Sequence, residues 1–206
     1  MQLNLFTSND KFRSEIYIVI KLLENGLQSL QIKKPDFTKK QLRSYIDQIP
    51  EKFHNKLIIH SHYNLIFKYN LKGIHISKHF RNKKIKFKTL LFLIKYFRKG
   101  KIISCSCHNI DKLLDVPKFY TNVFISPIFT KENNLNPLFP LKTLENIIPQ
   151  LESKVFATGG INLKNVDLIK NVGFEGVGLM GSIWFDDAKQ PLLHFKESKK
   201  KLTTLS

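Results

Sequence analysis

Four histidines close or follow short apolar runs that are typical of β-strands. His60 and His62 end one run, His75 lies in the next, and His108 closes a third. Imidazole is the side chain best suited to accept and return a proton near neutral pH. Because the carboxyl ends of parallel strands meet at one edge, these rings could act together on one ligand. We predict His62, His75 and His108 as acid/base groups and His60 as a substrate contact.

Histidine and cysteine can also bind metals, so a zinc site is an alternative. Ligands on adjacent strands would need a matching register, and no Asp or Glu stands at these strand ends. Cys105 and Cys107 alternate with Ser104, Ser106 and His108, so they face the other side of one strand. We therefore interpret both cysteines as structural, poor partners for a disulfide, and predict no metal ligands.

Two glycine-rich segments late in the chain, 154–162 and 176–183, predict an anion site. Each is a short apolar run that ends in small residues where a helix is expected to begin. Unpaired N–H groups and the helix dipole both favour phosphate there, and barrels often bind phosphate after strands seven and eight. Two tight turns without a ligand are the alternative. The predicted phosphate contacts are Gly159, Gly160, Met180, Gly181 and Ser182.

Further polar residues follow other predicted strands. Gln31 and Lys33 follow the second, Ser106 lies near the end of the fifth, and Ser126 and Lys131 follow the sixth. A cation at this edge predicts a second anionic group on the substrate, although a solvated lysine is the alternative for Lys33. We include all five residues among the predicted substrate contacts.

The elements that must position these residues alternate regularly between strand and helix. Strands are expected at 2–6, 27–32, 56–60, 73–76, 101–108, 122–125, 155–157 and 176–180. The first helix is expected from a cap at 8–10 to its end at 25–26, and the second from a cap at 38 to 49. Further helices are expected at 65–69, 89–97, 111–114, 141–151 and 163–171. Asn162 is the expected cap of the last helix, and a basic loop is expected before residue 89. Such alternation predicts an α/β fold, a single (β/α)8 TIM barrel with a closed, parallel, eight-stranded sheet. The alternative, an open doubly wound sheet, would place its phosphate glycines after the first strand, where Thr7 to Asn9 stand.

The length and composition fit one globular domain, residues 1–206, with a basic tail at 195–206. The chain is 42% hydrophobic, which excludes a disordered protein. Its apolar runs fall short of the roughly 20 residues that cross a bilayer, and the N-terminus lacks signal-peptide features. We expect a cytoplasmic protein with no membrane partner.

The net charge of +18 first suggests nucleic acid. The basic residues, however, occur as short pairs and triplets spread along the chain, such as 39–40, 83–84 and 199–201, and no nucleic-acid-binding motif accompanies them. We predict a phosphate-bearing small substrate and no nucleic-acid partner.

The residues described above resemble the thiamine phosphate synthase/TenI family over nearly the whole chain, and most closely its Bacteroidetes-type branch. The segments that carry the resemblance are 26–27, 30–35, 60–62, 73–76, 104–108, 126–129, 157–161 and 173–181. Synthases of this family join hydroxymethylpyrimidine diphosphate to thiazole phosphate with Mg²⁺ and release pyrophosphate. TenI-type members instead catalyse a proton shift that aromatises the thiazole.

The resemblance implies roles for several residues. Gly160, Met180 and Gly181 would hold the thiazole phosphate. Gln31 and Lys33 match a Gln and an Arg that contact the pyrimidine diphosphate, and Ser106 matches a serine near that diphosphate. Because family members are often oligomeric, a homo-oligomer is left open.

The chain also departs from the family pattern. His60-Ser61 replaces the Asn-Asp pair after strand three, and the second magnesium-binding Asp falls near Phe80. Pro127 stands where TenI-type enzymes carry a catalytic histidine, and a threonine-rich loop is shortened to Thr130-Lys131. Mg²⁺ is implied only if the coupling reaction is retained. Loss of the carboxylates favours a metal-free tautomerisation, and a barrel that only binds thiazole phosphate is a further alternative.

Overall fold

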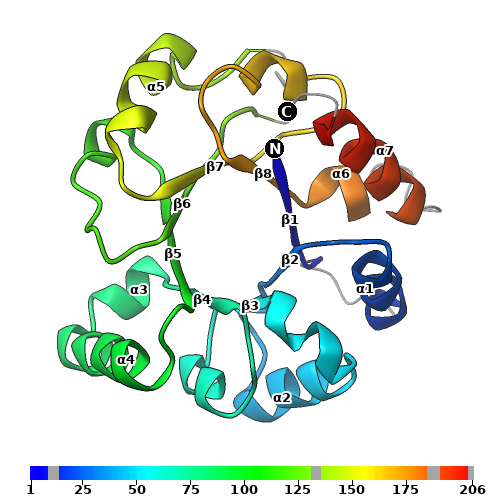
Figure 1. Ribbon diagram of the computed structural model, residues 1–206, viewed down its shortest axis with the longest axis vertical. Coiled ribbons are helices and arrows are strands. Elements are labelled where there is room, and N and C mark those ends of the chain that lie inside the picture. The colour runs from blue at the N-terminus through cyan, green and yellow to red at the C-terminus, as the bar shows by residue number, and fades with distance from the viewer. Residues whose placement is uncertain (9–13, 131–135, 185–190, 204–206) are drawn as a thin grey trace.

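The structure, a computed structural model, describes residues 1–8, 14–130, 136–184 and 191–203. Its eight strands form one closed barrel in which each strand pairs in parallel with its sequence neighbours (Figure 1). The ring closes where the first strand pairs with the eighth, with Asn4 beside Gly178. The predicted (β/α)8 barrel is therefore confirmed. No helix in the described ranges has the length and apolar character needed to cross a membrane.

The strands lie close to their predicted positions. They are β1 (Gln2–Phe6), β2 (Ser29–Ile32), β3 (Leu57–Ile59), β4 (Gly73–His75), β5 (Ile102–Cys107), β6 (Asn122–Ile125), β7 (Lys154–Thr158) and β8 (Gly176–Leu179). The α-helices are α1 (Glu15–Glu24), α2 (Lys39–Asp47), α3 (Lys78–Arg81), α4 (Lys84–Phe97), α5 (Leu141–Ile147), α6 (Gly181–Trp184) and α7 (Pro191–Thr203).

Short 3-10 helices follow α2 and α5 and replace the α-helix in other connections. They are η1 (Glu51–Lys56), η2 (Tyr63–Phe67), η3 (Ile110–Lys112), η4 (Ile148–Gln150) and η5 (Val166–Ile169). The β3–β4, β5–β6 and β7–β8 connections, which are described throughout, carry only such turns. These short crossovers explain how a chain of 206 residues closes an eight-fold barrel.

Local sequence signals set several helix ends. Thr38 caps α2 in a capping box, because its hydroxyl accepts from the Gln41 N–H while the Gln41 side chain accepts from the Thr38 N–H. Gly26, with φ of 91°, ends α1 as predicted. The cap predicted at 8–10 is wrong, because α1 begins at Glu15 and Ser14 occupies its N-cap position. Positions 9–10 lie outside the described residues.

Two other predicted elements differ in the structure. The expected helix at 163–171 is only the turn η5, because Asn165 accepts from the Asn162 N–H and donates to the Gly160 carbonyl, which holds the chain in a side-chain-bonded loop. The expected basic loop before residue 89 contains α3 and the first turn of α4. Lysine is a good helix former, so the charge run does not interrupt the helix.

The hydrophobic core lies between the strands and the surrounding helices. Outward strand residues such as Leu5, Leu30 and Ile74 pack with buried helix residues such as Leu22 and Leu42. Cys105 and Cys107 belong to this layer, as predicted, and both are unpaired thiols. Burial raises the pKa of Cys105 to about 12, so this side chain stays a neutral thiol and a packing residue.

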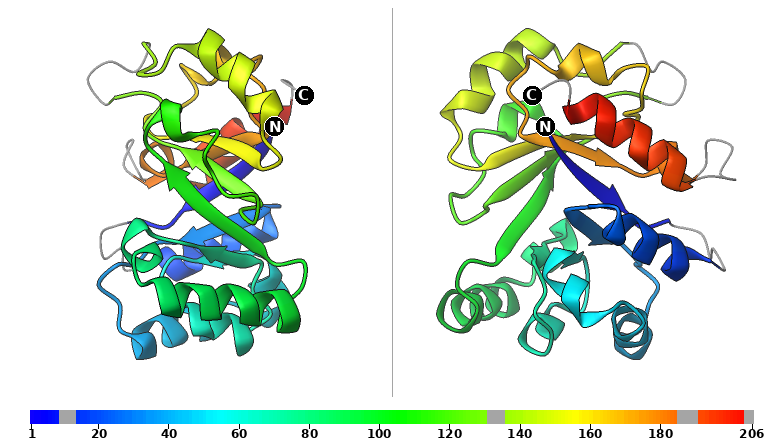
Figure 2. Two further views of the ribbon diagram at one scale, coloured as in Figure 1. Left: turned by 90° about the vertical axis from the view of Figure 1, so that its left-hand side faces the viewer. Right: turned by 45° about the vertical axis from the view of Figure 1, so that its right-hand side comes forward.

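The last helix completes the layer beside β1 and α1, as Figure 2 shows. Phe195 and Leu202 are buried, and the N-terminal ammonium of Met1 donates to the carbonyl of Leu202 at 3.4 Å. Residues 195–203 of the predicted basic tail are thus part of α7, with an apolar face that packs on the barrel. Residues 204–206 lie outside the described ranges.

A buried ion pair fixes the loop after β2 against α1. Lys34 Nζ lies 2.6 Å from Glu15 Oε2 and also donates to the Ser8 carbonyl at 2.6 Å. Tyr45 on α2 donates to the other Glu15 oxygen at 2.9 Å, and the pKa of Tyr45 is raised well above its usual value by burial and by the Glu15 charge. This network holds the backbone of the β2–α2 connection directly after Lys33.

Candidate active site

Aromatic and imidazole rings fill the barrel interior. His60 and His75 stack with ring centroids 4.3 Å apart and an interplanar angle of 13°. Phe6 contacts His60 and Phe124, and Phe124 contacts His75, so rings from β1, β4 and β6 meet across the lumen. Phe156 on β7 stacks on its register partner Phe124, with ring centroids 5.1 Å apart. The interior is a packed floor beneath the mouth.

Both ring nitrogens of His75 are hydrogen-bonded to serines. The Ser104 hydroxyl donates to the Ile74 carbonyl, so its oxygen accepts from His75 Nδ1–H at 3.0 Å. His75 Nε2 then accepts from the Ser106 hydroxyl at 3.1 Å. Burial, followed by the charge of Lys33, lowers the pKa of His75 to about 3. His75 is therefore a neutral ring at physiological pH, with its tautomer fixed by the two serines.

His60 begins a second polar chain within the lumen. Its Nε2–H donates to Gln31 Oε1 at 3.0 Å, and Gln31 Nε2 donates to Asn4 Oδ1 at 3.3 Å. Burial, the neighbouring His75 and the charge of Lys33 lower the pKa of His60 well below its usual value. The structure thus brings predicted residues Gln31, His60 and His75 together.

Lys33 is exposed at the mouth, directly after β2. Its backbone N–H donates to Thr7 Oγ1 at 3.0 Å, which ties the ends of β1 and β2 together. The charge of Lys33 is one cause, after burial, of the lowered pKa of both stacked histidines. It gives the mouth a cation for an anionic group.

His62 and His108 lie on different sides of the mouth. His62 has left-handed backbone geometry, with φ of 48°, and its Nε2–H donates to the Phe37 carbonyl at 2.7 Å in the β2–α2 connection. His108 is exposed, and its Nδ1–H donates to the Ser126 carbonyl at 2.6 Å. That bond leaves His108 Nε2 as the nitrogen with a lone pair.

The loop after β6 packs directly on the glycine pair after β7. The N–H of Phe129 donates to the Gly159 carbonyl at 3.1 Å. Gly159 and Gly160 have φ of 86° and 68°, and an added Cβ would lie 2.7 Å from the Cα of Pro127 and 2.5 Å from the carbonyl oxygen of Phe129, respectively. Both glycines are therefore required by the neighbouring loop as well as by the turn itself.

Some backbone N–H groups at this end of the barrel nevertheless have no hydrogen-bond acceptor among the described residues. In the described part of the chain the N–H groups of Gly160, Gly181 and Ser182 donate to no protein acceptor, whereas Ile183 and Trp184 both donate to the Met180 carbonyl. The buried Ser182 hydroxyl also has no partner among the described residues. Because β7 and β8 are paired neighbours, these donors lie at one corner of the mouth.

Oxygen ligands for magnesium are scarce at this mouth. The residues that directly follow the eight strands are Thr7, Lys33, His60, Ile76, His108, Ser126, Gly159 and Met180. None is a carboxylate, and the described residues contain no group of three or more His, Cys, Asp or Glu that could hold a metal. Mg²⁺ prefers carboxylate and phosphate oxygens, so the side chains present do not fit a protein-held magnesium site.

Lys131, which the sequence predicts as a substrate contact, lies outside the described residues.

The family model described as thiamine monophosphate synthase matches residues 3–183. The chain belongs to this family. A thiamine-phosphate synthase of Flavobacterium psychrophilum is 26% identical over 216 residues, with 98% of each chain covered. The crystal structure of a thiamine phosphate pyrophosphorylase from Bacteroides thetaiotaomicron is 30% identical, covers 98% of each chain and has a TM-score of 0.78. A Pyrococcus furiosus protein with the same description shares the fold, with a TM-score of 0.74 at 14% identity, covering 99% of this chain and 96% of its own.

Some residues of this thiamine monophosphate synthase family member were missed by the sequence reasoning. Asn4 ends the polar chain from His60, and Phe6 and Phe124 pack on the histidines. The alternation in β1 places Asn4 and Phe6 on one face, which is the signal that could have found them. Alternation puts Ser104 on the same side of its strand as Ser106, but the bond from Ser104 to His75 depends on the register of β4 with β5.

Proposed function

We propose that this protein binds a thiazole phosphate at the barrel mouth and transfers a proton on it without a protein-held metal ion. The observation that carries the proposal is the hydrogen bond from His108 Nδ1–H to the Ser126 carbonyl. It orients the imidazole so that Nε2 can accept a proton at the open mouth. Ser126 belongs to the same loop that packs on Gly159, so the base and the glycine corner share one support.

The unpaired N–H groups of Gly160, Gly181 and Ser182 support a phosphate at the β7–β8 corner. A phosphate oxygen there would receive main-chain hydrogen bonds, and the buried Ser182 hydroxyl would gain the acceptor that it lacks among the described residues. Lys33, on another side of the same mouth, would attract a second anionic group of the substrate.

The proposed reaction is a tautomerisation. His108 Nε2 takes a proton from one position of the non-aromatic thiazole ring and returns it at another, so atoms and charge are unchanged overall. The family resemblance expects a histidine where Pro127 stands, and His108 is bonded to the residue before Pro127. The neutral His75 and His60 would form the uncharged floor of the site, oriented by Ser106 and by Gln31.

The second candidate is the coupling reaction, which the names of the two relatives in Bacteroides and Flavobacterium favour. In that reaction the thiazole nitrogen forms a bond to the pyrimidine methylene carbon while pyrophosphate leaves. Gln31 and Lys33 would then contact hydroxymethylpyrimidine diphosphate, as the resemblance implies. Magnesium would have to arrive with the diphosphate, since the strand ends supply no carboxylate.

One pair of assays separates these functions. The first supplies the non-aromatic thiazole phosphate tautomer with EDTA and follows its conversion in heavy water by proton NMR. The second supplies thiazole phosphate, hydroxymethylpyrimidine diphosphate and Mg²⁺, and measures thiamine phosphate and pyrophosphate. Tautomerisation that persists in EDTA is the expected result. Thiamine phosphate formation that EDTA abolishes, with no tautomerisation, would overturn the metal-free reaction in favour of coupling.

Variants then test the assigned base. His108→Gln should lower the tautomerisation rate by about 100-fold or more, which is the usual contribution of a general base. His62→Gln, the matched change on the other side of the mouth, should leave most of the rate. Equal losses in both variants would contradict the assignment. Thermal stabilisation by thiazole phosphate without turnover in either assay would identify a barrel that only binds.

A further inference from the structure

The basic residues are spread along the chain, but the acidic residues are not, so the net positive charge is concentrated in one sector of the barrel. Residues 52–110 contain 12 lysines and two arginines but no Asp or Glu. The other 147 residues hold 20 basic and 16 acidic side chains, so this segment supplies +14 of the net +18. It forms β3, β4 and β5 with α3 and α4, which lie side by side on one side of the barrel (Figure 1).

The outer face of α4 combines this charge with exposed apolar side chains. Only Leu90 and Ile94 of this 14-residue helix are buried. Ile85, Phe92 and Tyr96 are 83%, 58% and 59% exposed, and the rings of Phe92 and Tyr96 lie with their centroids 4.5 Å apart. A surface helix normally turns such side chains toward the core, so an apolar stripe on the outer face of a soluble domain is typical of an interaction surface.

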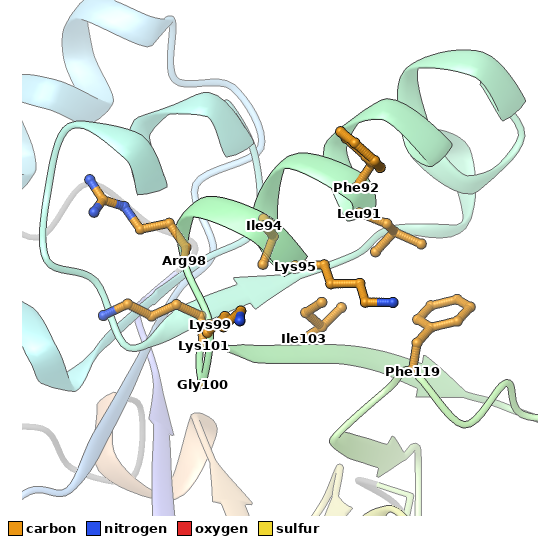
Figure 3. Close-up of a pocket in the computed structure, with 10 residues that line it drawn as sticks. All are labelled: Leu91, Phe92, Ile94, Lys95, Arg98, Lys99, Gly100, Lys101, Ile103 and Phe119. Atoms are coloured by element: carbon orange, nitrogen blue, oxygen red, sulfur yellow. The ribbon is translucent and has the colours of Figure 1, made fainter.

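A groove runs beside this stripe, between α4, the start of β5 and the segment before β6. Its volume is about 400 Å³. Leu91, Ile94 and Ile103 form its floor, and Phe92 and Phe119 stand at its edge, as Figure 3 shows. Its basic rim consists of Lys95, Arg98, Lys99 and Lys101. The groove lies on the outside of the barrel, away from the mouth.

Within the part of the chain that the structure describes, the rim has no internal counter-charge. None of the ion pairs in the described ranges involves a residue of 52–110. Arg98 is held by the carbonyls of Ile66 and Phe67, and Lys101 donates to the Asn70 amide oxygen, so both cations are fixed in place by neutral groups. Lys95 and Lys99 also line the rim and make no such bond to a described residue, so they are the cations that the carboxylates of a partner would meet.

We propose that this groove docks an acidic amphipathic helix of a protein partner, with an apolar anchor on the Leu91, Ile94 and Ile103 floor and carboxylates at Lys95 and Lys99. A concave slot with an aliphatic floor accepts a side chain from a helix, in the way that helix-in-groove recognition works. A second copy of this chain in a symmetric contact would bring two all-basic faces together, which like-charge repulsion opposes. This inference does not depend on the proposed reaction.

The test uses the full-length protein and a labelled acidic peptide of Glu and Ala, with Leu and Phe at helical i, i+4 and i+7 spacing. Fluorescence anisotropy at low and physiological salt measures its affinity, against a scrambled peptide of the same composition. Lys95→Glu and Leu91→Asn should each weaken binding about tenfold, as loss of one important contact does. Lys142→Glu, an exposed lysine on α5, is the matched control and should have little effect.

Several results would overturn the proposal. Equal affinity for the scrambled peptide, or equal loss in Lys142→Glu, would reduce the binding to net charge. Binding to phosphatidylserine vesicles or to single-stranded RNA that Lys95→Glu abolishes, with no preference for the ordered peptide, would assign the surface to another class of partner. Concentration-dependent dimerisation that Leu91→Asn removes would show that the groove is covered by a second copy.

Discussion

The buried, neutral His75 makes a quantitative prediction about acid stability. Its folded pKa is about 3, whereas an unfolded histidine titrates near 6.5. As the pH falls below about 6.5 the unfolded chain binds a proton that the folded chain does not, so stability is lost, and the loss continues down to about pH 3. At pH 5 the expected loss from this one residue is about 2 kcal/mol, and this figure changes little for any folded pKa near 3.

The perturbation is His75→Gln, which keeps a side chain able to bond with Ser104 and Ser106 but removes the titration. The variant should be less stable than the wild type at neutral pH because the stacking on His60 is lost. That stability gap should then narrow by about 2 kcal/mol between about pH 7.5 and pH 5. The pKa of His60 is lowered mainly by burial and also by His75. Replacing His75 therefore raises the pKa of His60 in the folded variant, which narrows the stability gap further in acid and leaves the direction of the prediction unchanged.

The assay is urea unfolding at both pH values, followed by the fluorescence of Trp184, the single tryptophan, which is 1% exposed. Phe156→Leu is the control, because it disturbs the lumen without changing a titratable group; its gap to the wild type should be the same at both pH values. A His75→Gln gap that stays constant or widens in acid would refute the assignment of a neutral, desolvated His75.

Two further predictions concern positions outside the histidine pair. Gly160→Ala should lower the urea midpoint more than Gly100→Ala, by an extra cost of about 1–3 kcal/mol in the free energy of unfolding. Both glycines have positive φ, but only at Gly160 would the new Cβ meet backbone atoms, 2.5 Å from a carbonyl oxygen. Equal losses in the two variants would contradict the close packing at Gly160. Glu15→Gln should lower the free energy of unfolding by about 3–5 kcal/mol, because the buried Lys34 loses its counter-charge. Glu24→Gln, which breaks an exposed ion pair on α1, should leave the urea midpoint unchanged. Similar midpoints for the two variants would show that the buried pair is not needed for stability.

The barrel could be predicted from the sequence because each strand is a short apolar run and each connection is long enough to cross back in parallel. The prediction was weaker for the connections. Asn162 looks like a helix cap in the sequence, yet its backbone N–H donates to the Asn165 side chain, which also donates to the Gly160 carbonyl and holds a loop. Helix capping and loop formation use the same residues, so local sequence does not distinguish them.

The sequence alone determined the fold class, the polar strand ends and the glycine corner, since these depend on hydrophobic periodicity and on residue types at fixed positions. Only the tertiary structure decided what each histidine can do. The register of β4 with β5 places His75 between two serines, while the bond to Ser126 leaves His108 with a free nitrogen at the mouth. A pKa depends on burial and neighbouring charges, and strands distant in sequence supply both.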